Sequence, residues 1–201
     1  FMMKEPKWST VRAKVTPLFS SAKLKSMLPL VLEIGDDMVK HIESTCLYIE
    51  STNCKDITVK YAIDVISSTI FGLKINSYQN SDFSEITKQI QGTSLSRLIQ
   101  LSTYFFAPIL VKTFDFKFAN LKPTAYVGKI ISDIIRVRED EQISRSDLID
   151  LIIQLKKKDP VLFDDDQIMA LSIQYLVAGF ESSGATIAYA LHELSLHTSI
   201  Q

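Results

Sequence analysis

Glycine and proline are scarce in this sequence of 201 residues, which contains six of each. Together they make up about 6% of the chain, half of the roughly 12% found in average proteins. Both residue types interrupt regular backbone, so their scarcity argues against a fold of many short strands joined by tight turns. The composition instead predicts a mainly α-helical protein with long helices.

Cysteine is also scarce, and neither basic nor acidic residues are in clear excess. Cys46 and Cys54 are the only cysteines, which excludes a disulfide-rich scaffold. No histidine or further cysteine stands near them at metal-ligand spacing, so a zinc site is not expected. The chain has 22 basic and 23 acidic residues and a net charge of −1. This balance argues against a nucleic-acid-binding protein, which normally carries a large positive excess.

No hydrophobic run is as long as the roughly 18 residues that a membrane span requires. The longest candidate, 168–180, is interrupted by Ser172 and Gln174, and there is no signal peptide. The chain starts at Phe1 without an initiator Met and stops at Gln201 soon after a long predicted helix. We therefore expect residues 1–201 to be a single incomplete domain, the internal part of a larger protein.

Prolines, capping residues and apolar spacing predict a series of helices. Pro6 suits a first helical position and Pro17 ends that helix, while Pro29 marks a start or a kink in the next. Gly72 suits a left-handed C-terminal cap, and Ser146 suits an N-cap. The expected helices are 6–16, 22–44, 57–71, 82 to beyond 100, 123–141, 147–158 and 165–196, with a loop at 76–81.

Aromatic residues are concentrated between the fourth and fifth predicted helices, at Tyr104, Phe105, Phe106, Phe114, Phe116 and Phe118. We interpret them first as a loop whose side chains fill a core. The alternative is a mobile apolar lid over a pocket or against a lipid surface.

The last predicted helix, 165–196, contains no proline and is apolar on most sides, which predicts a central position. Its middle, 178–185, is nevertheless weakened by two glycines, one acid and two serines. The small residues are explained by a close helix crossing, but Glu181 is not. Glu181 beside Ser182, opposite the missing side chain of Gly179, has the parts of a proton-transfer site next to a cavity.

The first predicted helix places Trp8 and Arg12 one turn apart. The indole N–H and the guanidinium can only donate hydrogen bonds, so their natural common target is an anion such as a carboxylate. On spacing alone, a cation–π pair on the helix surface is the favoured interpretation.

Together these two groups of residues resemble motifs of the cytochrome P-450 monooxygenases. Trp8-Ser-Thr-Val-Arg12 resembles the W-x-x-x-R motif of helix C in that family. Residues 178–183, Ala-Gly-Phe-Glu-Ser-Ser, resemble its helix I motif, [AG]-G-x-[DE]-T-[TS]. Stretches 64–73 and 146–152 are similar to helices E and H. The resemblance covers essentially the whole chain in the right order and is nearest to microsomal members of insects. It implies a partial cytochrome P-450 fold, helices C to I around a long central helix.

The resemblance also implies a cofactor, haem b, and roles for individual residues. Trp8 and Arg12 would donate to a haem propionate, and Ala178 and Gly179 would open the groove in which dioxygen binds. The catalytic pair, Glu181 and Ser182, would deliver protons by way of water.

For the substrate, the resemblance implies a small lipophilic molecule that reacts with O2. Phe180 would flank its pocket, and the segment that contains Phe105 and Phe106 would border substrate entry and the membrane surface. Electrons would come from NADPH through a P-450 reductase. The full-length protein would be attached to the endoplasmic reticulum membrane on its cytosolic face.

Two departures from the family pattern stand out. Position 182 is Ser where the family usually has Thr, so the hydroxyl is kept but its rotamer is less restricted. Neither Cys46 nor Cys54 lies in the Gly-rich context of the family's haem-binding cysteine, so no metal ligand is expected in this chain and the haem cysteine is expected beyond Gln201. Residues 1–201 alone are therefore predicted to be inactive.

Basic residues outnumber acidic ones over 1–25, and acidic residues dominate 139–166. Both segments suit a solvated surface, but a basic helix C would also steer an acidic reductase toward the protein. Two other interpretations remain. One is a non-enzymatic helical module that binds a lipid or a partner, and the other is a catalytically dead relative of the family.

Overall fold

A computed structural model describes residues 3–46, 53–79, 82–90, 94–117, 119–145 and 147–201. The described part is mainly α-helical and contains no strand. Its helices are α1 (Lys7–Val15), α2 (Ser21–Cys46), α3 (Cys54–Phe71), α4 (Asp82–Lys88), α5 (Leu95–Phe106), α6 (Pro108–Thr113), α7 (Leu121–Glu141), α8 (Leu148–Lys158) and α9 (Asp165–Leu196), with short 3-10 turns η1 (Thr16–Phe19) and η2 (Ser77–Gln79).

Several helix ends follow from the sequence as predicted. Pro17 stands in η1, directly after α1. Gly72 ends α3 in a left-handed conformation with φ of 62°, which a residue without a Cβ adopts readily. Asp164 caps α9 by accepting a hydrogen bond from the Gln167 N–H at 2.7 Å. α9 covers the predicted residues 165–196.

The helix predicted from Asp82 to beyond Gln100 is wrong, because two helices, α4 and α5, occupy that stretch. α4 ends in a turn that carries Ile90 into the core, where it is 1% exposed. The Ile90 carbonyl then accepts a hydrogen bond from the N–H of Asn120 at 3.0 Å. This contact ties the end of α4 to the start of α7.

Two predicted caps also differ from the structure. Pro6 occupies the N-cap of α1 and not its first helical position. The N-cap of α8 is Asp147, whose side chain accepts from the N–H of Asp150 at 3.2 Å. Ser146, the predicted cap, lies outside the described residues.

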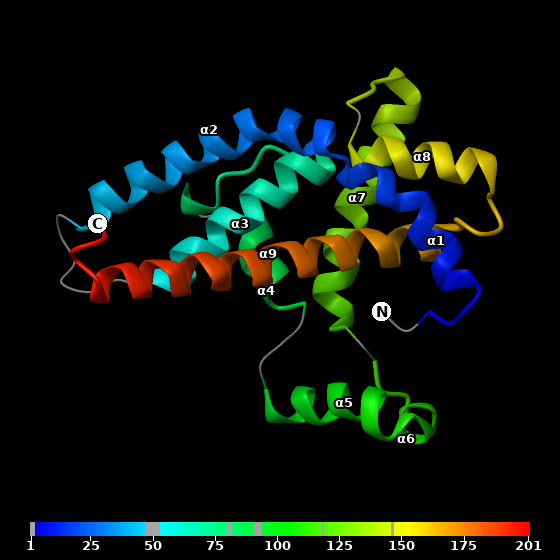
Figure 1. Ribbon diagram of the computed structural model, residues 1–201. Helices are drawn as coiled ribbons and strands as arrows, with labels where there is room; N and C mark the ends of the chain where they lie inside the picture. Colours follow the sequence, from blue (N-terminus) through cyan, green and yellow to red (C-terminus); the bar gives the residue numbers. More distant parts are fainter. Residues whose placement is uncertain (1–2, 47–52, 80–81, 91–93, 118, 146) are drawn as a thin grey trace.

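α9 is the axis of the arrangement (Figure 1). α3 runs along it, and α2 covers the other side of α3. α7 crosses α9 near its N-terminal half, where α8 also packs against α3 and α7. The C-terminal part of α9 is uncovered over much of its surface, because α3 packs on one side of it.

α3 and α9 approach each other closely at Gly184. A Cβ at Gly184 would lie 2.8 Å from the Cα of Val59, too close for any side chain unless the backbone moved. The buried hydroxyl of Thr58 donates to the Gly184 carbonyl at 2.8 Å. The close helix crossing predicted from the small residues is thus confirmed at Gly184.

A buried ion cluster joins α7, α8 and the end of α3. Arg138 is 5% exposed, and its Nη1 lies 2.6 Å from Asp147 and 2.9 Å from Asp150. Its Nη2 donates to the Phe71 carbonyl at 3.0 Å. Burial alone would lower the pKa of Arg138, but hydrogen bonds and attraction from the two carboxylates raise it above its ordinary value. The guanidinium is therefore charged and satisfied inside the fold.

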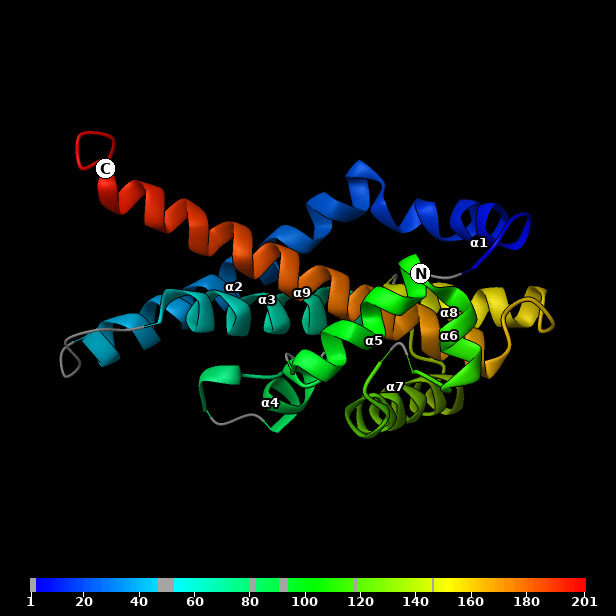
Figure 2. The ribbon, with the colours of Figure 1, turned by 90° about the horizontal axis from the view of Figure 1, so that it is seen from below.

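α5 and α6 form a hairpin that projects from the rest of the molecule (Figure 1). Seen from below, the two helices lie in front of α8 and α9 (Figure 2). Phe106 is 86% exposed, and Ile109 and Phe114 are also largely exposed. Phe105, Phe106 and Phe114 therefore do not fill a core of the described part, in contrast to the first interpretation, whereas Tyr104 and Phe116 are half-buried. Phe118 lies outside the described residues. Within the described ranges, no helix is both long and apolar enough to span a lipid bilayer.

Candidate cofactor and substrate site

Trp8 and Arg12 form the cation–π pair that their spacing favours. The Arg12 Cζ lies 5.2 Å from the centroid of the Trp8 ring. The same two residues also line a hollow of about 140 Å³ between α1 and α9, to which α9 contributes Leu171, Gln174 and Tyr175. Stacking on the indole therefore holds the guanidinium at the wall of this hollow, which we call the α1–α9 hollow.

The electrostatics of the α1–α9 hollow favour an anion. None of the residues that line it is acidic, and Arg12 makes no ion pair with any described residue. Burial raises the pKa of Tyr175 above its ordinary value, while the positive charge of Arg12 acts in the opposite direction. The Tyr175 ring is held by Phe19, with the ring centroids 5.6 Å apart. The hollow thus combines the positive charge of Arg12 with uncharged hydrogen-bond donors such as Trp8 and Tyr175.

Ala178 and Ser182 lie one turn apart on the uncovered side of α9, and both are exposed. The Ser182 hydroxyl donates to the Ala178 carbonyl at 2.6 Å, and the Thr186 hydroxyl donates to the Ser182 carbonyl at 2.8 Å. Such bonds loosen a helix and suit ordered water. The expectation that this stretch is buried is wrong for Ser182, because no described element covers that side.

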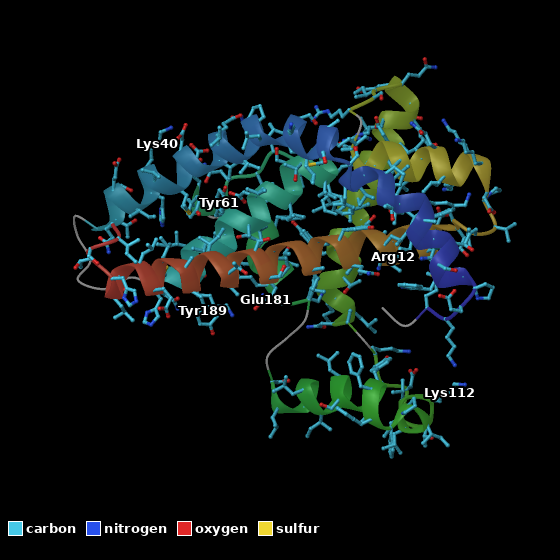
Figure 3. All side chains as sticks on the ribbon, viewed as in Figure 1. Arg12, Lys40, Tyr61, Lys112, Glu181 and Tyr189 are labelled. Carbon is cyan, nitrogen blue, oxygen red and sulfur yellow. The ribbon has the colours of Figure 1, made fainter. Side chains whose placement is uncertain are left out.

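Glu181 lies on a neighbouring side of α9, toward α3. Its carboxylate accepts from the Lys55 ammonium at 3.1 Å, and both side chains are about half exposed. Figure 3 shows Glu181 near the middle of α9 and Arg12 on α1. Gly179 also faces α3, since a Cβ there would lie 2.5 Å from the Ile66 Cδ1. Of the two small residues Ala178 and Gly179, it is therefore Ala178 that lies on the uncovered face of α9.

The three predicted substrate residues are separated in the structure. Phe180 is 2% exposed and belongs to the core between α9 and α3. Phe105 and Phe106 are 65% and 86% exposed at the end of α5. Leu101, one turn before Phe105 on the same helix, lines a cavity in the described part of the chain.

This cavity, which we call the apolar cavity, lies between α9, α5 and the start of α7. Its volume is about 430 Å³, within the roughly 300–1,000 Å³ of small-molecule sites. The wall from α9 includes Met169, Ile173 and Val177, and Ile90 contributes from the end of α4. Sequence reasoning missed these residues, although the spacing of four between the three that lie on α9 was a usable signal.

Thr124 of α7 is a polar exception in the wall of the apolar cavity. Its hydroxyl oxygen is buried and has no hydrogen-bond partner among the described residues. Gln174 is another exception, and it lines both the apolar cavity and the α1–α9 hollow. The two sites are thus adjacent along α9.

Cys54 is not among the residues that line either site. Cys54 is exposed at the first position of α3, and the side chain of Cys46 is outside the described part. Within the described ranges, no group of three or more His, Cys, Asp or Glu side chains is arranged to hold a metal ion.

Fold and site together define a mainly α-helical protein with a cavity of small-molecule size beside its longest helix. The family model described as Cytochrome P-450 matches residues 1–201, and the chain belongs to this family. It is 31% identical to probable cytochrome P-450 6g2 of Drosophila melanogaster, over 100% of this chain and 42% of that protein. It is 30% identical to cytochrome P-450 6k1 of Blattella germanica, over 100% of this chain and 43% of that protein.

The relatives are insect proteins, as the sequence resemblance indicated. The chain spans about two fifths of the length of these curated relatives. The structure is accordingly a partial cytochrome P-450 fold, in which α1 carries the W-x-x-x-R motif and α9 carries the motif of residues 178–183.

Proposed function

We propose that the full-length protein is a haem-thiolate monooxygenase that inserts one oxygen atom of O2 into a small lipophilic substrate. The α1–α9 hollow beside the apolar cavity is the observation that carries this proposal, because it provides an anion site and a substrate site along one helix. Bound haem would supply the iron at which dioxygen is activated, with its cysteine ligand expected beyond Gln201.

Trp8 and Arg12 would hold the haem through a propionate. Both side chains only donate hydrogen bonds, and no acidic side chain in the wall of the hollow competes for them. A charge-assisted bond from a guanidinium to a carboxylate is about twice as strong as a neutral one. The residues present therefore fit the anionic edge of this cofactor.

Ala178 would leave room on the uncovered face of α9, where a larger side chain would fill the space next to the cofactor. Ser182, one turn further, would hold a proton at Oγ on that same face. Its bond to the Ala178 carbonyl fixes the hydroxyl near the loosened turn. Glu181, half exposed and paired with Lys55, would exchange protons with bulk water and pass them on through ordered water.

The substrate would occupy the apolar cavity, which would favour lipophilic molecules because most of the residues that line it are apolar. Phe105 and Phe106 would not contact a bound substrate in this arrangement but would border its entry from the exposed tip of α5. The α5–α6 hairpin exposes several large apolar side chains, among them Phe106, Ile109 and Phe114, which would suit contact with a membrane surface. We propose that the full-length protein is attached to the endoplasmic reticulum membrane on its cytosolic face.

Electrons would come from NADPH by way of a P-450 reductase that docks on α1. Lys7 and Lys14 on this helix make no ion pair with described residues, so their charge is available to an acidic partner. Residues 1–201, as a single incomplete domain, would not turn over substrate by themselves.

The experiment measures the carbon-monoxide difference spectrum of the reduced full-length protein, together with its haem content. We expect the spectrum of a thiolate-bound haem and a severalfold loss of haem per polypeptide in Arg12→Ala. Lys7→Ala on the same helix serves as the control, because Lys7 does not line the hollow. A full-length protein without the spectrum would be a dead relative or a binding module.

A further inference from the structure

The strap, which we define as residues 72–79, leads from the end of α3 toward α4. It runs back between α2 and α3 (Figure 1). Tyr78 of the strap contacts both helices, because its hydroxyl donates to the Ile57 carbonyl of α3 at 2.9 Å and its ring stacks on His41 of α2, with the ring centroids 4.6 Å apart. In the chain the strap precedes α4, whose closing turn places Ile90 in the wall of the apolar cavity.

A buried contact fastens the strap to α3. Asp64 of α3 is 3% exposed, and Ser77 of the strap is 2% exposed. The Asp64 Oδ2 accepts a hydrogen bond from the Ser77 N–H at 2.9 Å, and the Asp64 Oδ1 is hydrogen-bonded to the Ser77 hydroxyl. One residue of the strap thus uses both carboxyl oxygens, and we call this contact the Asp64–Ser77 clasp.

The carboxyl of the clasp is buried without a cation of its own. Among the described residues Asp64 makes no ion pair, and Lys60, one turn earlier, pairs with Asp56 at 3.3 Å. Burial, and to a smaller extent the negative charge of Asp37 on α2, raise the pKa of Asp64 above its ordinary value. The hydrogen bonds from Ser77 and the charge of Lys60 act in the opposite direction without cancelling the effect of burial.

The other titratable groups around the clasp do not supply the missing positive charge. Burial raises the pKa of Tyr61 and of Tyr78, so both phenols are neutral at physiological pH. His41 stacks on the ring of Tyr78. Lys74, the cation of the strap, is exposed and pairs with Glu33 of α2 at 2.7 Å.

The geometry of the clasp suits a protonated carboxyl. A neutral Asp64 donates its own hydrogen from Oδ1 to the Ser77 hydroxyl oxygen and still accepts from the Ser77 N–H at Oδ2. An ionised Asp64 accepts both bonds but places a charge in a buried site, where its desolvation opposes the closed contact. The clasp is therefore more stable when Asp64 carries a proton.

We propose that the Asp64–Ser77 clasp is a pH-sensitive fastening of the strap, which protonation of Asp64 tightens and ionisation loosens. Because the pKa of Asp64 is higher in the folded protein than in an unfolded chain, the stabilisation is fully present below the ordinary value of an aspartyl carboxyl. It is lost as the pH rises through the raised value. The clasp involves only α3 and the strap, so it operates whether or not the protein is a monooxygenase.

Hydrogen exchange of the Ser77 amide tests the clasp, because this N–H donates to Asp64. Its protection factor, the exchange rate of an unstructured chain divided by the observed rate, is measured in the full-length protein. From about pH 4 to about pH 8, which covers the ordinary pKa of an aspartyl carboxyl and several units above it, protection should fall. We expect a decrease of about three- to tenfold, the equivalent of one hydrogen bond.

Asp64→Asn is the matched variant, because its amide stays neutral and keeps both an acceptor for the Ser77 N–H and a donor for the Ser77 hydroxyl. Protection of the Ser77 amide should therefore stay high across the whole pH range in this variant. The same decrease in Asp64→Asn and in the unmodified protein would overturn the proposal.

Two control variants remove the other titratable groups of α2 that contact the strap. His41→Gln removes the imidazole that stacks on Tyr78, and Glu33→Gln removes the exposed partner of Lys74. Both variants should keep the decrease in protection, since neither residue is bonded to Asp64 in the described part of the chain. If either substitution abolishes the decrease, the pH dependence does not originate at the clasp and the proposal is wrong.

Infrared difference spectroscopy reports the protonation state itself and does not depend on how the strap moves. At about pH 5 exposed aspartyl carboxyls are mostly ionised, whereas a large part of Asp64 should still carry its proton. The spectrum of the unmodified protein minus that of Asp64→Asn should then contain the C=O band of a protonated carboxyl, which disappears toward higher pH. A carboxylate band in its place at the lower pH would overturn the proposal even if Asp64→Asn alters exchange rates.

Discussion

At the scale of single residues, Ser182 is the position of α9 where the sequence departs from the helix I motif of the family. Its hydroxyl donates a hydrogen bond to the Ala178 carbonyl at 2.6 Å. Serine lacks the β-methyl group that restricts rotation about χ1. The proposed proton donor is therefore held by one hydrogen bond and not by sterics as well.

Replacing Ser182 with Thr should improve the coupling of oxygen use to product in the full-length enzyme. The added methyl group restricts the rotamer, so the hydroxyl spends more time in the position that delivers protons. The measurement is hydrogen peroxide released per product formed, which we expect to decrease. Ser183→Thr is the control, because Ser183 makes no such bond to the preceding turn among the described residues. An equal decrease in Ser183→Thr would show that the effect is not local.

The residues of the candidate site were predictable from the sequence to different degrees. Trp8 and Arg12 were recognisable because one helical turn brings two donors together, and the structure adds the hollow that they line. Gln174 was not singled out as a site residue. Its position between the two sites depends on walls that come from α1, α5 and α7, and no local pattern encodes such a meeting.

At the scale of elements, the contact of α3 with α9 depends on the absence of a side chain. Gly184 sits against the backbone of Val59, and the Thr58 hydroxyl bonds to its carbonyl. The same helix therefore uses one glycine for packing against backbone and another, Gly179, for packing against the Ile66 side chain.

Gly184→Ala should destabilise the protein by about 1–3 kcal/mol, because overpacking against backbone outweighs the helix propensity of Ala. Gly35→Ala on α2 is the matched control. No atom lies within 4 Å of a Cβ at Gly35, so this variant should gain about 0.5–1 kcal/mol. Both effects are measured as changes in the free energy of unfolding, determined by urea denaturation. A neutral Gly184→Ala would mean that α3 shifts freely along α9.

Arg138→Gln should lower the free energy of unfolding by about 3–5 kcal/mol, because Asp147 and Asp150 would be left buried without their cation. Arg136→Gln on the same helix removes an exposed ion pair with Asp133 and should change stability by less than about 1 kcal/mol. Urea denaturation of the two variants measures the difference in their free energies of unfolding. Equal effects would show that the buried cluster contributes no more than a surface pair.

Element boundaries were predictable where a single residue determines them, as at Gly72 and Asp164. The division between α4 and α5 was not predictable from the sequence. The turn after α4 is stabilised by Ile90 entering the core and by its bond to Asn120, thirty residues later in the chain. Such a contact becomes visible only when the start of α7 is in place.

At the scale of the whole molecule, the near-zero net charge conceals an uneven distribution. Most of the charged residues among the first 25 are basic, whereas the segment 139–166 is rich in Asp and Glu. The basic segment includes α1, which also carries Trp8 and Arg12. The proposed docking surface and the proposed cofactor anchor thus share one short helix.

Reversing both Lys7 and Lys14 to Glu should slow reduction by the reductase about tenfold at low ionic strength, because steering of an acidic partner is lost. The rate should also become less sensitive to salt. Lys122→Glu with Lys129→Glu, on α7, reverses the same charge elsewhere and should leave the rate nearly unchanged. Stopped-flow reduction of the full-length protein measures both. A rate insensitive to salt in the unmodified protein would contradict docking on α1.

Trp8 is the only tryptophan among the 201 residues, and it lies against Arg12 in the wall of the α1–α9 hollow. All indole fluorescence of this region therefore originates at the proposed cofactor anchor. Haem absorbs at the wavelengths at which tryptophan emits, so energy transfer would quench this emission on binding. The cation–π pair thus gives these residues a built-in optical reporter, whose intensity follows occupancy of the hollow without any added label.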